Sequence, residues 1–305
     1  MPIPVPYPTV DPTVYERGSL PVLTLSRGTV TLSLSIANGW VVLPGVEGLD
    51  DPPRTLISVD PATWDGSLMT GVRYAARDVF LPLHYAASDT ATLRAAVRDL
   101  AVLLDVKRGP CTLEVAHADG ARRTIDGWLS APFGQALESR EATLWRRVGV
   151  ALRAPDPYFT GAEQTITWRL ADDTTEFLSS TFLPVQVGDS QVGGTVIIDN
   201  GGDADAYPVW TVTGPCSDLT CTAADGATTF TVPAGLAEDE TLVVDARRGE
   251  QTVTVDGAPA WDRVGSGALL GALAPGVNTL TVVASGAAST TTIAAAWTER
   301  WLTAW

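Results

Sequence analysis

The sequence predicts a mainly β protein with one long helix, and three observations lead to this fold class. Apolar residues alternate with other residues over many short segments, which is typical of strands with one buried face. Turn residues such as Asp119-Gly120 separate these segments. Helical spacing of apolar residues occurs over one long stretch, residues 88–106. We therefore expect two β-sandwich-type domains, an α+β N-terminal domain that carries the helix and a C-terminal domain built from strands.

The stretch from residue 73 to residue 125 predicts the order strand, helix, strand, strand. Val79, Leu81 and Leu83 alternate within residues 77–85, as in a strand. Ser88-Asp89 then offers a helix N-cap, and Gly109-Pro110 ends the helix. Segments 111–115 and 123–125 follow as a hairpin through Asp119-Gly120. The apolar face of the helix is expected to comprise Leu93, Ala96, Val97, Leu100, Leu103 and Leu104.

Other segments of the N-terminal half read as strands, turns and an arm. Residues 20–36 predict a hairpin with its turn at Ser26-Arg27-Gly28, Trp64-Asp65-Gly66 predicts a further turn, and residues 142–152 predict a strand. Alternating prolines remove backbone donors and favour an extended arm, which we expect to lie on a neighbouring subunit. These prolines are Pro2, Pro4, Pro6 and Pro8.

Length and charge indicate two domains, residues 1–160 and 161–305. A chain of 305 residues is longer than most single cores. The first part holds 15 basic and 17 acidic residues, a net charge of −2, whereas the second holds 5 and 18, a net charge of −13. Two prolines break regular structure at the same place, in Ala154-Pro-Asp-Pro-Tyr-Phe159. The overall charge of −15 argues against recognition of nucleic acid or an anionic membrane.

The C-terminal half predicts an antiparallel sandwich or jelly roll. Its short alternating segments are separated by Gly, Asn and Asp turns, with no helical pattern between them. The predicted strands cover residues 165–170, 195–198, 207–213, 228–232, 241–245, 251–255, 278–284 and 290–297.

Motifs that carry chemistry are scarce, so we predict no catalytic, cofactor or metal residues. His84 and His117 are the two histidines, and neither lies at metal-ligand spacing from a cysteine. The sequence has no Walker A, G-x-S-x-G or G-x-G-x-x-G motif. Acidic groups at Asp172-Asp173 and Glu238-Asp239-Glu240 fit solvated loops better than the paired carboxylates of a glycosidase.

The cysteines and the hydropathy pattern favour a soluble protein without a signal peptide. No charged n-region with an apolar h-region opens the sequence, and no apolar run of about 18 residues occurs. Cys111 is alone in its domain. Cys216 and Cys221 are close enough for a disulfide only if residues 217–220 form a tight turn, so reduced thiols are favoured and the bridge stays open as the alternative.

Nine of the ten tryptophans divide into two groups. Those in or beside predicted strands are expected in cores, with stacking on sugar rings as the alternative. The second group, Trp301 and Trp305, either closes the last strand or docks on another chain, because large rings at a tail would otherwise lie in water. The first group comprises Trp64, Trp128, Trp145, Trp168, Trp210, Trp261 and Trp297.

The order of these motifs is similar to that of one family. In the N-terminal half they are Trp64-Asp-Gly66 with Arg73, strand 77–85, helix 88–106, segment 107–115, the Asp119-Gly120 hairpin and the motif 154–159. This order resembles that of the distal tail proteins of long-tailed bacteriophages, which are siphovirus-type minor tail proteins. Segments 199–208, 249–257 and 273–280 resemble the galectin-like C-terminal sandwich of the same family.

The resemblance implies a structural virion protein that is not an enzyme. It implies a hexameric ring at the tail tip, assembled in the bacterial host cytoplasm, in which the N-terminal domain joins the tail tube to the baseplate hub. The implied partners are copies of the chain, the tail tube protein, the tape-measure protein and the hub or tail-associated protein. No cofactor and no membrane insertion are implied.

Two hypotheses remain from the sequence. The first is the tail-tip ring, in which Arg94 and Arg98, one helical turn apart and off the apolar stripe, meet carboxylates of the next subunit or are simply solvated. The second is a carbohydrate-binding sandwich that adheres to a host surface, or less favourably a glycosidase. A ring with a central hole is expected from the first hypothesis alone.

Overall fold

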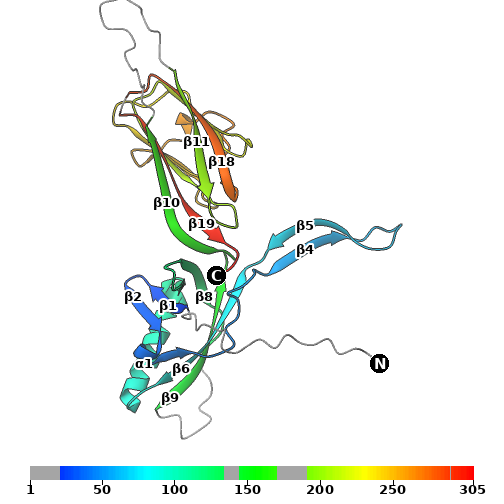
Figure 1. The fold of residues 1–305 in the computed structure, drawn as a ribbon, viewed down its shortest axis with the longest axis vertical. Coiled ribbons are helices and arrows are strands. Elements are labelled where there is room, and N and C mark those ends of the chain that lie inside the picture. Colours follow the sequence, from blue (N-terminus) through cyan, green and yellow to red (C-terminus); the bar gives the residue numbers. More distant parts are fainter. Residues whose placement is uncertain (1–20, 134–143, 170–190, 289) are drawn as a thin grey trace, which may run out of the picture. The chain divides into compact units, whose positions relative to one another are not determined.

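The structure is a computed structural model that describes residues 21–133, 144–169, 191–288 and 290–305. The chain forms two compact units (Figure 1). Unit 1 comprises residues 1–159 together with Thr303–Trp305, and unit 2 comprises Thr160–Leu302. The expected boundary between the two domains follows residue 160, one residue after the boundary between the units. The last three residues, which were expected in the second domain, belong to unit 1.

Unit 1 contains two antiparallel sheets, a hairpin and the long helix. One sheet has the order β8-β7-β1-β2, and in the other β6 lies between β3 and β9, with β9 also pairing β8 over Trp128 and Leu129. The hairpin is formed by β4 and β5. The strands are β1 Val22–Arg27, β2 Val30–Leu34, β3 Trp40–Val42, β4 Arg54–Val59, β5 Leu68–Tyr74, β6 Arg77–Ala86, β7 Cys111–Ala116, β8 Arg122–Leu129 and β9 Trp145–Ala154.

The core of unit 1 confirms the predicted alternation and helical face. Val79, Leu81 and Leu83 of β6 are buried, opposite Leu152, Val150 and Val148 of β9. Helix α1, Thr90–Leu103, is the one α-helix among the described residues and buries Leu93, Leu100 and Leu103. The predicted helix is longer than α1, because the 3-10 turn Val106–Arg108 follows Asp105, whose side chain caps it by accepting from the Lys107 N–H.

A buried arginine holds the segment that leaves unit 1. Arg77, at the start of β6, is fully buried. Its Nε donates to the Pro157 carbonyl at 2.7 Å, and its Nη1 donates to the carbonyls of Gly48 and Asp50. The guanidinium also lies 4.8 Å from the centre of the Phe159 ring. Arg77 therefore fixes the 48–50 loop and the segment 157–159 with one planar group.

Unit 2 is a β-sandwich, as the sequence predicts. One sheet has the order β17-β16-β15-β12-β19-β10 and the other β11-β18-β13-β14. The strands are β10 Phe159–Arg169, β11 Gln191–Asn200, β12 Val209–Thr213, β13 Asp218–Ala223, β14 Thr229–Val232, β15 Thr241–Asp245, β16 Thr252–Val255, β17 Ala258–Pro259, β18 Gly276–Ser285 and β19 Thr292–Trp301, with the 3-10 turn Trp261–Arg263 before β18.

The inner faces of these two sheets share one core. Trp210 and Val212 of β12 belong to the same buried cluster as Phe230 of β14 and Leu280 and Val282 of β18. The predicted turn Asp199-Asn200-Gly201-Gly202 closes one end of it. The Asn200 side chain is fully buried there, and its Nδ2 donates to the carbonyls of Ala204 and Leu273 at 3.1 and 3.0 Å. One amide group therefore joins two loops that are distant in sequence.

Strand β13 lies where the sequence analysis expected no strand. Segment 218–223 alternates exposed and buried residues and pairs with both β14 and β18. Because this segment is extended, it cannot form the tight turn that a Cys216–Cys221 bridge requires. All three cysteines are buried free thiols. Burial raises the pKa of Cys111 to about 11 and that of Cys221 to about 12.

The prediction that strand-associated tryptophans lie in cores is wrong for four of the seven. Trp210 and Trp297 are buried and Trp168 packs partly on the core. The reason for the failures is that the other four rings lie on strand faces or in turns that are only partly covered, so that 39–63% of each side chain stays exposed. The exposed rings are Trp64, Trp128, Trp145 and Trp261.

Independent folding of the acidic sandwich stays a prediction. We expect residues 161–305, expressed alone, to give a soluble β fold, because the sandwich core draws its buried side chains from strands of unit 2. Circular dichroism on heating tests this directly, and the absence of a cooperative β transition would contradict it.

In the described part of the chain no helix is long and apolar enough to cross a membrane.

Candidate functional site

The polar face of α1 is the first candidate assembly surface. Asp89 begins the helix by accepting from the N–H groups of Ala91 and Thr92 at 2.8 and 2.9 Å. These bonds and the Thr92 hydroxyl lower the pKa of Asp89 to about 2. Arg94 and Arg98 are exposed, as the helical spacing predicts, and neither takes part in an ion pair with a described residue. Both cations are therefore available for contacts outside the subunit.

A shallow groove lies beside the last turn of α1. Its volume is about 390 Å³, and Val102 and Val106 on its wall are 40% and 45% exposed. Two charged residues, Arg98 and Asp105, also line it. The lining residues are Arg98, Ala101, Val102, Leu104, Asp105, Val106 and Leu129.

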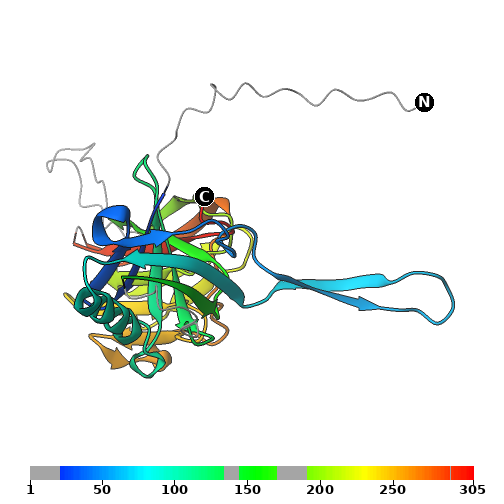
Figure 2. The same ribbon diagram turned by 90° about the horizontal axis from the view of Figure 1, so that it is seen from below.

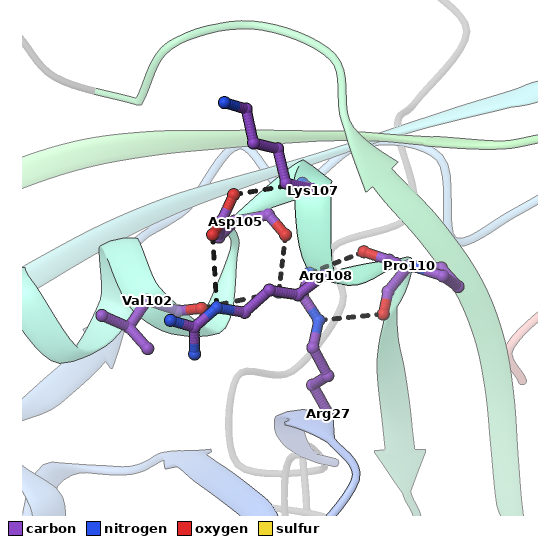
Figure 3. A network of polar contacts seen from close by, with 7 residues as sticks. Arg27, Val102, Asp105, Lys107, Arg108 and Pro110 are labelled. Atoms are coloured by element: carbon purple, nitrogen blue, oxygen red, sulfur yellow. Dashed lines mark hydrogen bonds and ion pairs between the residues drawn. The ribbon is translucent and has the colours of Figure 1, made fainter.

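A second arginine, Arg27, holds the backbone around this groove in place. Figure 3 shows its guanidinium among the carbonyl groups that follow α1. Its Nη1 donates to the Asp105 carbonyl at 2.8 Å, Nη2 to Gly109 at 2.9 Å and Nε to Pro110 at 3.1 Å. A cation at the carbonyl end of a helix is favourable, because the helix dipole is negative there. Arg27 therefore ties the end of β1 to the end of α1.

The β4–β5 hairpin is an exposed part of unit 1. Figure 2 shows it as a two-stranded ribbon extending from the sheets of that unit. None of the residues 54–74 is buried. At its base the Ala75 N–H donates to the Pro53 carbonyl at 2.8 Å, and Tyr74 packs edge-on against Tyr158 at 5.7 Å between ring centres. The sequence predicts a β-turn between two strands at Trp64–Gly66, without bounds for the strands, and β4 and β5 are these strands.

Residues 303–305 form a small contact of their own with unit 1. Ala304 is fully buried, its N–H donates to the Leu49 carbonyl at 2.8 Å, and its own carbonyl accepts from His117 Nε2 at 2.6 Å. Trp305 donates from Nε1 to Asp50 Oδ1 at 2.6 Å, and its ring lies 5.8 Å from that of His117. Because a carbonyl oxygen only accepts, the hydrogen bond places the His117 proton on Nε2.

Two of the polar groups that the sequence analysis weighed as chemical candidates, His84 and Glu240, have structural partners, whereas Asp172 and Asp173 lie outside the described residues. His84 lies in β6 with its ring 5.7 Å from that of Trp145. Glu240 accepts from the Ala237 N–H and pairs with Arg263, and both contacts lower its pKa. Among the described ranges no group of three His, Cys, Asp or Glu side chains is placed to hold a metal ion.

The predicted interface residues are only partly brought together. Pro2, Pro4, Pro6 and Pro8 lie outside the described residues. Trp301 ends β19 in unit 2, half-buried, whereas Trp305 belongs to unit 1 and keeps 54% of its surface exposed. Docking of these rings on another chain therefore stays a prediction.

The residues that the sequence analysis missed are Arg27 and Arg77, whose roles depend on carbonyl groups far away in the sequence.

Comparison with protein families gives one match. Residues 201–301 match the model of the siphovirus-type tail component, C-terminal domain. The matched range begins in the turn after Asn200 and ends with β19, so it covers most of the sandwich of unit 2. A comparison with curated protein sequences found no match.

Comparison with solved structures extends the likeness to nearly the whole chain. The SPP1 Dit (gp 19.1) protein, described as a paradigm of the hub adsorption apparatus in phages that infect Gram-positive bacteria, is 17% identical with a TM-score of 0.62. The match covers 92% of this chain and 99% of that protein. A chain of the phage P2 baseplate in its activated conformation with Ca is 8% identical, with a TM-score of 0.48 and coverage of 88% and 99%. The chain therefore has the fold of the SPP1 Dit protein.

Proposed function

We propose that this chain, a structural component of a siphovirus-type phage tail and hence part of the virion, forms a ring at the tip of the tail. The observation that carries the proposal is the tail-component match over residues 201–301, on a chain whose fold matches that of the SPP1 Dit protein over 92% of its length. Six copies, contacts with the tail tube, the tape-measure protein and the baseplate hub, and a galectin-like fold of the sandwich belong to this proposal.

Unit 1 is the better candidate for the ring-forming part. Its segment 1–160 has a net charge of −2 with 15 basic residues, whereas residues 161–305 have a net charge of −13. A surface with both signs of charge can pair head to tail with copies of itself, and such a contact closes into a ring when it repeats around an axis. Strongly acidic surfaces repel their copies, which favours solvent exposure of the sandwich.

The proposal includes the absence of catalysis. It is supported by the contacts of two groups considered above. Glu240 forms an ion pair with Arg263, and the His84 ring lies beside the ring of Trp145. The carbohydrate-binding alternative has one observation in its favour, the 51% exposed ring of Trp261 on unit 2. Negative-stain images of the purified chain separate the two functions, because the ring with a central hole is expected from the structural role alone.

Mass photometry of the full chain is the direct test, and we expect a species several times the mass of 32.0 kDa. A chain that stays monomeric at all accessible concentrations would contradict the proposal.

The contributions of the N-terminal arm and of the α1 arginines to ring stability can be ranked in the same experiment. Deleting residues 1–10 should weaken the ring more than the double substitution Arg94→Ala and Arg98→Ala, because exposed ion pairs contribute only about 0–1 kcal/mol each. The opposite order would remove the arm from the interface.

A further inference from the structure

One short loop of unit 1, residues 48–50, contacts both segments through which the chain passes between the units. The first is segment 157–159, which Arg77 ties to this loop before the chain enters unit 2. The second is the C-terminal tripeptide 303–305, which returns to unit 1 after β19. Strands β10 and β19, which begin and end at these two crossings, are neighbours in one sheet of unit 2. Both crossings are therefore anchored at the same place on unit 1.

Unit 1 recognises the tripeptide by its last two residues. The N–H of Ala304 donates to the Leu49 carbonyl at 2.8 Å, and its carbonyl accepts from His117 at 2.6 Å, so both of its backbone groups are satisfied. Ala304 is fully buried, which leaves no space for a larger side chain. Asp50 accepts from the Trp305 indole at 2.6 Å, a donor that phenylalanine lacks. The contacts therefore select a small residue followed by a tryptophan.

The two crossings differ in how firmly they are held. Arg77 and Phe159 at the first crossing are fully buried, and strand β10 begins directly at Phe159. Residues 303–305 belong to no helix or strand, and Trp305 keeps 54% of its surface exposed. Chain ends with few buried contacts open locally long before the body of a protein unfolds. The second crossing therefore opens much more readily than the first.

We infer that residues 48–50 and His117 form a binding site for the chain's own C-terminal tripeptide, and that this tripeptide is a latch. While the latch is closed, unit 2 is joined to unit 1 at two points. When it opens, the one connection left is the bond between Phe159 and Thr160, and rotation about the backbone dihedrals around it becomes free. The latch therefore controls the rotational freedom of the acidic sandwich. This inference does not depend on the ring proposed above.

Release of the last residue by carboxypeptidase A measures how often the latch opens. The enzyme removes aromatic C-terminal residues, and it reaches the Trp305 peptide bond only when the tripeptide has left its site. Mass spectrometry follows the loss of Trp305 from the full chain and from a synthetic peptide of residues 298–305. The ratio of the peptide rate to the chain rate is the protection factor of the latch.

Three variants weaken the latch in different ways. His117→Phe keeps an aromatic ring but removes the donor, Asp50→Ala removes the acceptor of the indole, and Ala304→Leu does not fit the buried site. Each should lower the protection factor about tenfold or more, relative to a peptide of its own sequence. The matched control is Asp51→Ala, which removes a carboxylate of the same loop that pairs with Arg54 and should stay within about twofold of the parent. Equal thermal unfolding of all variants establishes that the opening is local.

The freedom of unit 2 is measured by the distribution of distances between two spin labels in electron-resonance experiments. Labels are attached to Ala118→Cys in unit 1 and to Asp205→Cys in unit 2, both at exposed positions. The three native thiols are buried, so the introduced cysteines take the labels. Deleting residues 303–305 should broaden the distribution, whereas Asp51→Ala should leave it as in the parent.

Three results would overturn the inference. A parent chain that loses Trp305 as fast as the free peptide, or equal protection in all four variants, would show that the site does not bind the tripeptide. Protection that falls on dilution would show that the site holds the tripeptide of another copy. An unchanged distance distribution after the deletion would show that the latch does not control unit 2. Each measurement works on a monomer as well as on a ring, so failure of the proposed ring leaves the inference standing.

Discussion

Replacing Arg77 by methionine should destabilise unit 1 by about 3–5 kcal/mol. The methionine keeps the apolar stem but removes the donors that serve the carbonyls of Pro157, Gly48 and Asp50. These hydrogen bonds are partly buried, and a carbonyl left without a partner away from water costs about 1–3 kcal/mol. Burial lowers the pKa of Arg77, which the charges of Asp51 and Asp50 oppose, and the guanidinium stays charged at any working pH.

The matched control is Arg153→Met on the neighbouring strand β9. Arg153 pairs with Asp78 at 3.1 Å, but both side chains are more than half exposed, so the loss should be within about 1 kcal/mol. Arg77→Lys should fall between the two, because a single ammonium cannot reach three carbonyls in a plane. Native-state hydrogen exchange of β6 and β9 amides measures the opening free energy of unit 1. Equal effects of Arg77→Met and Arg153→Met would show that the buried network contributes nothing.

Replacing Asn200 by alanine should destabilise unit 2 by about 2–4 kcal/mol. The buried side chain donates to two carbonyls and its Oδ1 accepts from the Gly202 N–H at 3.2 Å. A side chain at Gly202 would meet the Arg300 backbone at 2.7 Å, so this turn has no space to rearrange around a missing amide. Hydrogen exchange of β11 and β18 reports the loss.

Asn278→Ala is the matched control, because it removes the same number of hydrogen bonds from a half-buried site. Asn278 accepts from the Ala274 N–H and donates to the carbonyls of Ala274 and Gly276, and water can replace these bonds, so about 1 kcal/mol is expected. Asn200→Asp adds a pH test. Burial raises the pKa of a carboxyl above its unfolded value, so the protonated form is favoured in the fold and the destabilisation should shrink as pH falls from 7 to 4. A loss independent of pH would argue against a buried site.

Local patterns were sufficient for the elements of unit 1 that have one covered face. The alternation around Leu81 and the spacing from Leu93 to Leu104 predict β6 and α1, because an amphipathic face has to be buried whichever neighbour covers it. Turns at Gly28 and Gly120, both with positive φ, were also readable, since few other residues adopt that conformation. The same reasoning placed the sandwich strands, and missed β13 because its threonines and cysteine gave a weak alternation.

Exposure is the property that local patterns could not decide. Leu56 and Val72 look like core residues in sequence, and Trp64, Trp128, Trp145 and Trp261 were placed in cores for the same reason. Whether an apolar strand face meets another layer depends on residues far away in the chain, and in the hairpin no described element covers it. This is why the exposure of the hairpin was found only in three dimensions.

The sequence by itself determined the mainly β fold, the one long helix, the acidic second half and the exposed arginines of α1, because each depends on residue type and short-range spacing. Tertiary structure alone decided that Arg77 and Asn200 are buried anchors, that residues 303–305 return to unit 1, and that the hairpin stands uncovered. The anchors and the return of the last residues depend on contacts between distant parts of the chain, such as Arg77 with Gly48, 29 residues apart, and Trp305 with Asp50, 255 residues apart. Such pairings leave no periodic signal in the chain, since neither partner is specified by the residues next to it.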